Sequence, residues 1–240
     1  MTNQPFLFFG VCKLCLQQRE LCDSHIIPEF MYKPLYDNKH RAIAVSANGT
    51  EQEETIQKGY REPLLCKECE NRLSVWETHV ARVWSKVLEQ TSGATAGSFT
   101  LRARYFDLKL FYLSLFWRAS LSRHPNFGAV DLGAQESAIR DMLWSGTPGP
   151  ITAYPSFAFA YSGIAMLART IGIAGAGTMF GVPAFKLPIS GIELIFFNTN
   201  DLPEAAQNSF LAVSHRGLTI GVSNVPESHE IQRMAQNIFR

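Results

Sequence analysis

The chain has 240 residues, enough for one large domain or two smaller ones, and 46% of them are hydrophobic against 18% charged. This composition excludes wholesale disorder and is ordinary for a soluble globular protein. The 22 Lys and Arg residues nearly balance the 21 Asp and Glu residues, so the chain lacks the basic arm that many nucleic-acid-binding proteins carry.

The N-terminal segment does not resemble a secretory signal. Met1 to Phe9 lacks a basic start and a long apolar core, so we expect a cytoplasmic location. No membrane association is expected either. The apolar stretch from Tyr105 to Ser120 is short and interrupted by charges, and the stretch from Phe157 to Val182 contains Arg169 and five glycines.

Five cysteines lie within the first 69 residues, and four of them form two CxxC pairs separated by 50 residues. Two thiolates from each pair can face one cation, and four sulfurs at tetrahedral corners are typical of a structural Zn²⁺ site. The spacing therefore predicts one Zn²⁺ bound by Cys12, Cys15, Cys66 and Cys69. Two separate thiol pairs, or a redox-active CxxC, are the alternatives. The fifth cysteine, Cys22, is expected to pack as a small buried hydrophobe.

The second cysteine pair opens into a predicted helix over Asn71 to Gln90, because apolar residues recur there at spacings of three and four. The segment that follows, Thr91 to Thr100, is rich in small residues and predicts a linker or loop. We therefore expect a zinc-binding module over residues 1–92 and a second domain over residues 93–240.

The second domain is expected to be a mixed α+β domain. Two helices are predicted first, a buried one over Tyr105 to Ser120 and an amphipathic one over Ala134 to Trp144. Beyond Gly149 the pattern changes to short apolar runs that are typical of strands. These runs are Phe157 to Tyr161, Ile164 to Leu167, Thr178 to Phe180, Ile192 to Phe197, Phe210 to Val213 and Leu218 to Val222. A last helix is predicted over Glu227 to Phe239.

The region between the cysteine pairs contains Ser24-His25-Ile26-Ile27-Pro28, and the second pair reads Cys-Lys-Glu-Cys-Glu-Asn as it enters the helix. Together with the two CxxC pairs, these segments resemble the HNH endonucleases of the ββα-metal, or His-Me finger, superfamily. The resemblance covers about residues 10–90. It implies an α+β protein with an N-terminal zinc-stapled ββα-metal-like module.

The resemblance also implies roles for individual residues. A His at the end of a strand deprotonates water, and the preceding residue and one on the helix hold a single Mg²⁺ or Mn²⁺ ion. Carried over, His25 is the general base and Glu70 the helix ligand, at a position that is usually His or Asn. Ser24 stands where the family has Asp, and Arg61 where it has Asn. Two further carboxylates, those of Asp23 and Glu62, are also considered as ligands.

Two functions remain open at this point. The first is an HNH-like metal-dependent endonuclease that acts on nucleic acid, more often DNA than RNA, with a role like that of bacterial defence nucleases and a C-terminal domain that binds a substrate or protein partner. The second is a catalytically inactive zinc module that binds protein or nucleic acid. In that case His25 is a structural residue, and Glu70 only favours the helix dipole.

Overall fold

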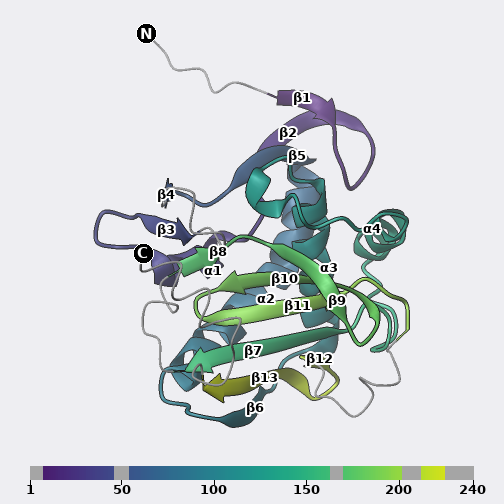
Figure 1. Ribbon diagram of the computed structural model, residues 1–240. Coiled ribbons are helices and arrows are strands. Elements are labelled where there is room, and N and C mark those ends of the chain that lie inside the picture. Colours follow the sequence, from purple (N-terminus) through teal and green to yellow (C-terminus); the bar gives the residue numbers. More distant parts are fainter. Residues whose placement is uncertain (1–7, 46–53, 163–169, 202–211, 225–240) are drawn as a thin grey trace.

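The computed structural model describes residues 8–45, 54–162, 170–201 and 212–224. Within these ranges the chain forms a small three-stranded sheet, a large mixed sheet of ten strands and several helices. Figure 1 shows the small sheet at the top and the strands of the large sheet in front of helices α2 and α3. The predicted α+β class is confirmed.

The small sheet brings together segments from both ends of the cysteine-containing region. It consists of β1 (Phe8–Val11), β2 (Gln18–His25) and β5 (Arg61–Cys66), in the order β1-β2-β5 and antiparallel throughout. Strand β5 runs directly into the long helix α2 (Lys67–Thr91). The first CxxC pair therefore lies at the turn between β1 and β2, and the second lies at the junction of β5 and α2.

The chain between β2 and β5 reaches into the second sheet. It forms α1 (Glu29–Tyr32), the 3-10 helix η1 (Lys33–Leu35), β3 (Ala42–Val45) and β4 (Glu54–Ile56). Strand β3 pairs in parallel with β8 (Thr170–Gly172) and antiparallel with β4. The segment bracketed by the cysteine pairs is thus joined to the C-terminal part of the protein by a backbone ladder.

The large sheet has the order β12-β13-β7-β11-β10-β8-β3-β4, with β6 added beside β13 and β9 beside β10. Its pairings are antiparallel except for β3–β8 and β13–β7, which are parallel. The strands not yet given are β6 (Gly97–Leu101), β7 (Ser156–Ser162), β9 (Gly175–Met179), β10 (Val182–Ile189), β11 (Ile192–Phe197), β12 (Val213–Ser214) and β13 (Gly217–Asn224).

Helix α3 (Tyr105–Leu121) is buried along nearly its whole length between α2 and the large sheet. Its Phe116 ring stacks on Phe196 of β11 with 4.9 Å between the ring centroids. The 3-10 helix η2 (Pro125–Phe127) and helix α4 (Gln135–Ser145) follow it. Among the described residues, no helix is both long enough and apolar enough to cross a membrane.

The strongly periodic elements are where the sequence predicted them. Helices α2, α3 and α4 confirm the three predicted helices, with ends shifted by a few residues. Strands β7, β11 and β13 confirm the strand predictions that begin at Phe157, Ile192 and Leu218. The predicted strand over Ile164 to Leu167 and the predicted helix over Glu227 to Phe239 lie outside the described residues.

The prediction of a linker or loop over Thr91 to Thr100 holds for residues 92–96, which lie outside helices and strands, and was wrong for the rest. Strand β6 occupies most of its second half and pairs with β13 from Gly97↔Val222 to Leu101↔Leu218. The hydrophobic core is also continuous, because buried residues of α2 and α3 belong to the same cluster. A boundary at residue 92 stays a prediction.

One buried side chain ties the two halves together. Arg118 of α3 is 1% exposed, and its Nη1 donates to the backbone oxygen of His25 at 2.9 Å. Its Nη2 lies 2.9 Å from Glu77 Oε1 on α2, and its Nε donates to the Ser114 oxygen at 3.3 Å. The guanidinium therefore connects α3, α2 and the end of β2 at a single point.

We expect Arg118→Ala to lower the free energy of unfolding by roughly 3–5 kcal/mol, because it leaves the Glu77 carboxylate and the His25 carbonyl without their buried partner. Urea denaturation followed by tryptophan fluorescence measures the loss. Arg140→Ala is the matched control, since Arg140 pairs with Asp141, whose side chain is 68% exposed. That change should cost less than about 1 kcal/mol. Equal losses in the two variants would contradict the role given to Arg118.

Candidate metal centre

The first cysteine pair lies in a tight turn between β1 and β2. The backbone N–H of Leu16 donates to the Cys12 oxygen at 2.8 Å, and Leu16 itself has a positive φ of 59°. The N–H of Lys13 donates to the Leu64 oxygen at 3.0 Å. This last bond fixes the turn against β5, the strand that delivers the second cysteine pair.

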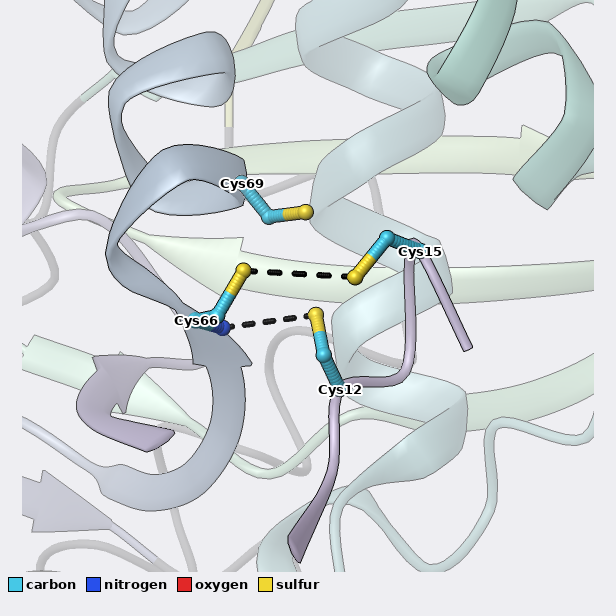
Figure 2. A group of neighbouring side chains, drawn as sticks. All are labelled: Cys12, Cys15, Cys66 and Cys69. Carbon is cyan, nitrogen blue, oxygen red and sulfur yellow. Dashed lines mark hydrogen bonds between the residues drawn. The ribbon is translucent and has the colours of Figure 1, made fainter. Parts of the chain in front are cut away.

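The second pair is positioned by the strand-to-helix junction. Cys66 is the last residue of β5 and precedes α2, and Cys69 lies in the first turn of that helix. The backbone N–H of Cys66 donates to Cys12 Sγ at 3.3 Å. Figure 2 shows the four side chains pointing toward one another from the two segments. Backbone N–H donors of this kind stabilise sulfur in its thiolate form.

The sulfur atoms form one compact group, the four-cysteine cluster (Cys12, Cys15, Cys66 and Cys69). All four Sγ atoms lie within 4.8 Å of one another, and the distance from Cys15 Sγ to Cys66 Sγ is 4.0 Å. Four thiolates about 2.3 Å from a tetrahedral zinc ion lie about 3.8 Å apart. Cys12, Cys66 and Cys69 are at most 3% exposed. The cluster can therefore hold a metal ion such as zinc, as the sequence predicted.

The pKa values of three thiols of the cluster, Cys12, Cys15 and Cys69, are shifted from the ordinary value. Burial raises the pKa of Cys69, and its neighbours Cys66 and Cys12 raise it further. Burial also raises the pKa of Cys15. At Cys12 burial acts in the same direction, but backbone N–H groups, among them that of Cys66, bring the pKa below its ordinary value. Four crowded thiolates repel one another, and a divalent cation at their centre is what allows all four to ionise.

The fifth cysteine lies outside the cluster. Cys22 is on β2, is partly exposed rather than fully buried as expected, and is not disulfide-bonded. Burial raises the pKa of its thiol, and the nearby charge of Glu70 adds to the rise. Cys22 therefore differs from the four clustered cysteines in position while sharing their chemistry, which makes it a suitable control.

His25 is the last residue of β2, and its imidazole is held by three groups. Its Nε2 lies 2.9 Å from Glu29 Oε2 and 3.1 Å from the Lys58 oxygen. The Nε of Arg61, directly opposite on β5, lies 3.0 Å from the same nitrogen. The His25 side chain is 22% exposed, so water can reach it.

These contacts favour one tautomer of His25. Both oxygens near Nε2 can only accept, whereas Arg61 Nε has another acceptor in the Lys58 oxygen at 3.1 Å. A proton on Nε2 therefore satisfies more of the network than a lone pair would. The basic nitrogen is then Nδ1, which makes no hydrogen bond within the part of the chain that the structure describes.

The loop that presents the Lys58 oxygen is locally constrained. Lys58 and Gly59 both have positive φ, 73° and 69°. A Cβ atom at Gly59 would collide with the buried ring of Tyr32, whose hydroxyl accepts a hydrogen bond from the N–H of Tyr60 at 3.2 Å. Only glycine combines this backbone conformation with this close approach. The position of the Lys58 oxygen beside His25 is therefore set by the packing of Tyr32.

The candidate metal ligands around His25 do not converge on it. Ser24 is 1% exposed, and its hydroxyl accepts from the Leu65 N–H at 3.1 Å. Glu62 accepts from Ser122 and from the N–H groups that follow α3, so its carboxylate is occupied. Asp23 is 62% exposed and lies 3.8 Å from Arg61 Nη1.

Glu70 lies in the first turn of α2, next to Cys69. One of its carboxylate oxygens is buried and has no hydrogen-bond partner within the described ranges. Across the same ranges Glu70 shares no hydrogen bond or ion pair with His25. The four-cysteine cluster is also the one group of three or more His, Cys, Asp or Glu ligands that the structure assembles within those ranges.

Two partners of His25 were not predicted from the sequence. Glu29 lies four residues after His25, and the spacing within Ser-His-Ile-Ile-Pro-Glu was the available signal, because Pro28 starts a short helix that returns the carboxylate to the imidazole. Tyr36 also donates to Glu29 Oε1 at 3.1 Å. The Lys58 oxygen had no sequence signal at all, since its position depends on the loop backbone.

Comparison with known proteins leaves the site to be interpreted from its own geometry. No protein-family model, curated protein or solved structure matches this chain.

We expect the purified protein to contain about one equivalent of a metal ion such as zinc per chain. A Cys12→Ser/Cys66→Ser variant should lose this metal and much of its stability, because metal binding contributes folding free energy. Elemental analysis and thermal unfolding measure both effects. Cys22→Ser is the matched control and should keep its metal. Full metal retention by the double variant would contradict the assignment of the ligands.

Proposed function

We propose that this protein is an HNH-like endonuclease that hydrolyses phosphodiester bonds of nucleic acid. The observation that carries the proposal is His25, which ends a strand, is oriented through Nε2 and keeps Nδ1 unbonded in the described structure. Its strand β2 pairs with β5, and β5 continues into α2. That order of two antiparallel strands and a helix is what the resemblance to HNH nucleases implies.

In this proposal the ion in the four-cysteine cluster is Zn²⁺ with a structural role. Four thiolates complete its coordination and leave no position for water or substrate. The cluster joins the turn after β1 to the start of α2, and so it holds β2 and β5 in register. The zinc site supports the placement of His25 and takes no part in the reaction.

The proposed chemistry uses the groups around His25. Nδ1 takes a proton from water, the water oxygen forms a bond to phosphorus, and the bond from phosphorus to the leaving oxygen breaks. The leaving oxygen then takes a proton from solvent. Glu29 and the Lys58 oxygen hold the Nε2 proton, and Arg61 is placed to contact the phosphate.

Hydrolysis of this kind also needs charge neutralisation at the phosphate, which a Mg²⁺ or Mn²⁺ ion supplies when bound. Such ions are often held by only one or two carboxylates, with substrate phosphate and water as the other ligands. Glu70 is the proposed carboxylate, because one of its oxygens is buried without a hydrogen-bond partner in the described part of the chain. Asp23, which is exposed, is available as a second ligand.

A preference for DNA over RNA and a role like that of nucleases in bacterial defence rest on the resemblance alone. A cytoplasmic location and a protein partner for the C-terminal domain are also proposed, and neither comes from the resemblance, which covers about residues 10–90. Residues 93–240 supply the helix that contacts the His25 backbone through Arg118. A partner bound to that domain would therefore contact a part of the protein that packs against the His25 site.

A second candidate is a zinc module that binds protein or nucleic acid without cleaving it. Ser24 favours this candidate, because its hydroxyl is buried and bonded to the Leu65 N–H where an HNH nuclease has a metal-binding Asp. The two candidates share the zinc site and differ in whether His25 acts as a base.

The decisive test is cleavage of plasmid DNA, single-stranded DNA and RNA with added Mg²⁺ or Mn²⁺. His25→Ala should reduce cleavage by about 10²–10⁴-fold, because it removes the general base. Glu29→Gln should reduce it less, since it removes only the group that orients the imidazole. Glu70→Ala should raise the concentration of divalent ion needed for activity.

Arg140→Ala is the control, because Arg140 lies on α4 and pairs with Asp141, whose side chain is 68% exposed. It should retain wild-type cleavage, and all variants should retain their zinc. Equal cleavage by wild type and His25→Ala would refute the role of His25. Absence of cleavage by the wild type on every substrate would support the zinc module that only binds.

A further inference from the structure

A second candidate site lies near the middle of α2, well away from its cysteine end. An open pocket of about 650 Å³ is lined by His79, Arg102, Ala103, Arg104, His215 and Arg216. These residues come from three segments: helix α2, the connection between β6 and α3, and the turn between β12 and β13. Three arginines and two histidines thus meet in one concave surface of a chain whose overall charge is close to zero.

The arginines of the pocket are not all neutralised. Arg104 forms an ion pair with Asp107 in the first turn of α3. Arg102 and Arg216 are exposed and have no carboxylate partner in the part of the chain that the structure describes. Two guanidinium groups, with five N–H donors each, therefore face solvent beside the N-terminal end of α3. Such donors match the oxygens of a phosphate group.

His79 helps to build the pocket without acting as a base in it. Its Nε2 accepts a hydrogen bond from the Arg104 N–H at 3.1 Å, and its Nδ1 lies 3.8 Å from Asp107 Oδ2. Burial lowers the pKa of His79. Both ring nitrogens are thus engaged within the protein, and the imidazole holds Arg104 and Asp107 in place. His79 is therefore a structural member of the pocket.

The walls of the pocket are fixed by close backbone contact. Gly217 follows the turn between β12 and β13 and has a φ of 122°. A Cβ atom there would collide with the Leu101 oxygen and the Ala103 N–H. The turn that carries Arg216 is therefore pressed against the segment that carries Arg102. His215, on the same turn, lies with its ring 4.5 Å from that of Tyr105.

We propose that this pocket is a phosphate-binding site, with Arg102 and Arg216 as the main ligands. The pocket is open and lined by long cationic side chains, and lacks the enclosed apolar walls typical of sites for small organic cofactors. The phosphate belongs either to the backbone of a nucleic acid or to a small phosphorylated molecule. The inference is independent of the proposed nuclease activity, because none of these residues contacts the His25 site.

The pocket is separated from the cysteine cluster by several turns of α2. At a rise of 1.5 Å per residue, His79 lies roughly 20 Å along the helix axis from Cys66. The pocket and the cysteine cluster therefore lie at different positions along the same helix.

The test measures binding without added Mg²⁺ or Mn²⁺, so that cleavage of the probe does not affect the measured affinity. The probes are a short fluorescein-labelled DNA duplex, followed by anisotropy, and ATP and inorganic phosphate, followed by calorimetry. Arg102→Gln and Arg216→Gln should each weaken binding about tenfold at low salt. For the duplex, each change should also reduce the slope of log K against log salt by about one.

Arg140→Gln, which removes the same charge from α4, is the matched control and should bind like the wild type. If the two pocket variants weaken only duplex binding, the ligand is a nucleic-acid backbone. If they weaken ATP or phosphate binding, the ligand is a small phosphorylated molecule. Binding unaffected by either variant, or no binding of any probe, would overturn the proposal. If the protein binds the duplex through the pocket but does not cleave nucleic acid, the phosphate-binding proposal is supported and the nuclease proposal is contradicted.

Discussion

The buried guanidinium of Arg118 is the interaction on which the arrangement of this protein depends. A charge that is 1% exposed is stable only with close partners, and its partners are the Glu77 carboxylate and two backbone oxygens. One of these oxygens belongs to His25. The requirement to satisfy a single arginine therefore fixes α3 relative to α2, and fixes both relative to the residue that ends β2.

The cysteine cluster also helps to fix strand β2, at the end opposite to His25. It joins the turn after β1 to the start of α2, while Arg118 holds the end of β2 from α3. Strand β2 is thus fixed at both ends, and β5 lies beside it with Arg61 opposite His25. The chain between them also reaches the large sheet through β3 and β8. The region that carries His25 is integrated with the rest of the protein and does not stand alone.

Sequence patterns predicted those parts of the fold whose signal is local. The α2 helix and the four clustered cysteines were predictable, because hydrophobic spacing of three and four residues indicates a helix and two CxxC pairs indicate a metal site. Strand β6 was not, since TSGATAGSFT has the composition of a linker and becomes a strand only through pairing with β13. Strand β10 was missed because its two prolines argue against a strand within a sheet.

The candidate site likewise combines residues that the sequence predicted with contacts that it did not predict. The roles of His25 and Glu70 were predicted from motif position and stay predictions, while the partners of His25 depend on loop geometry. Ser24, which stands at the family's metal-ligand position, accepts a hydrogen bond from the Leu65 N–H, and Glu62 accepts from backbone groups after α3. In the same way His79 of α2 lies against Arg104 and Asp107, which are distant from it in the sequence. Such contacts between distant segments leave no trace in local spacing.

Gly59 has a consequence for how related sequences would diverge. Its backbone conformation and its contact with Tyr32 exclude every other residue type, whatever the chemistry at His25. Selection for folding alone should therefore retain glycine at this position, whereas retention of the His25 side chain would follow only from the proposed activity. Under that proposal, a lineage that kept Gly59 but replaced His25 would have kept the fold without the proposed reaction.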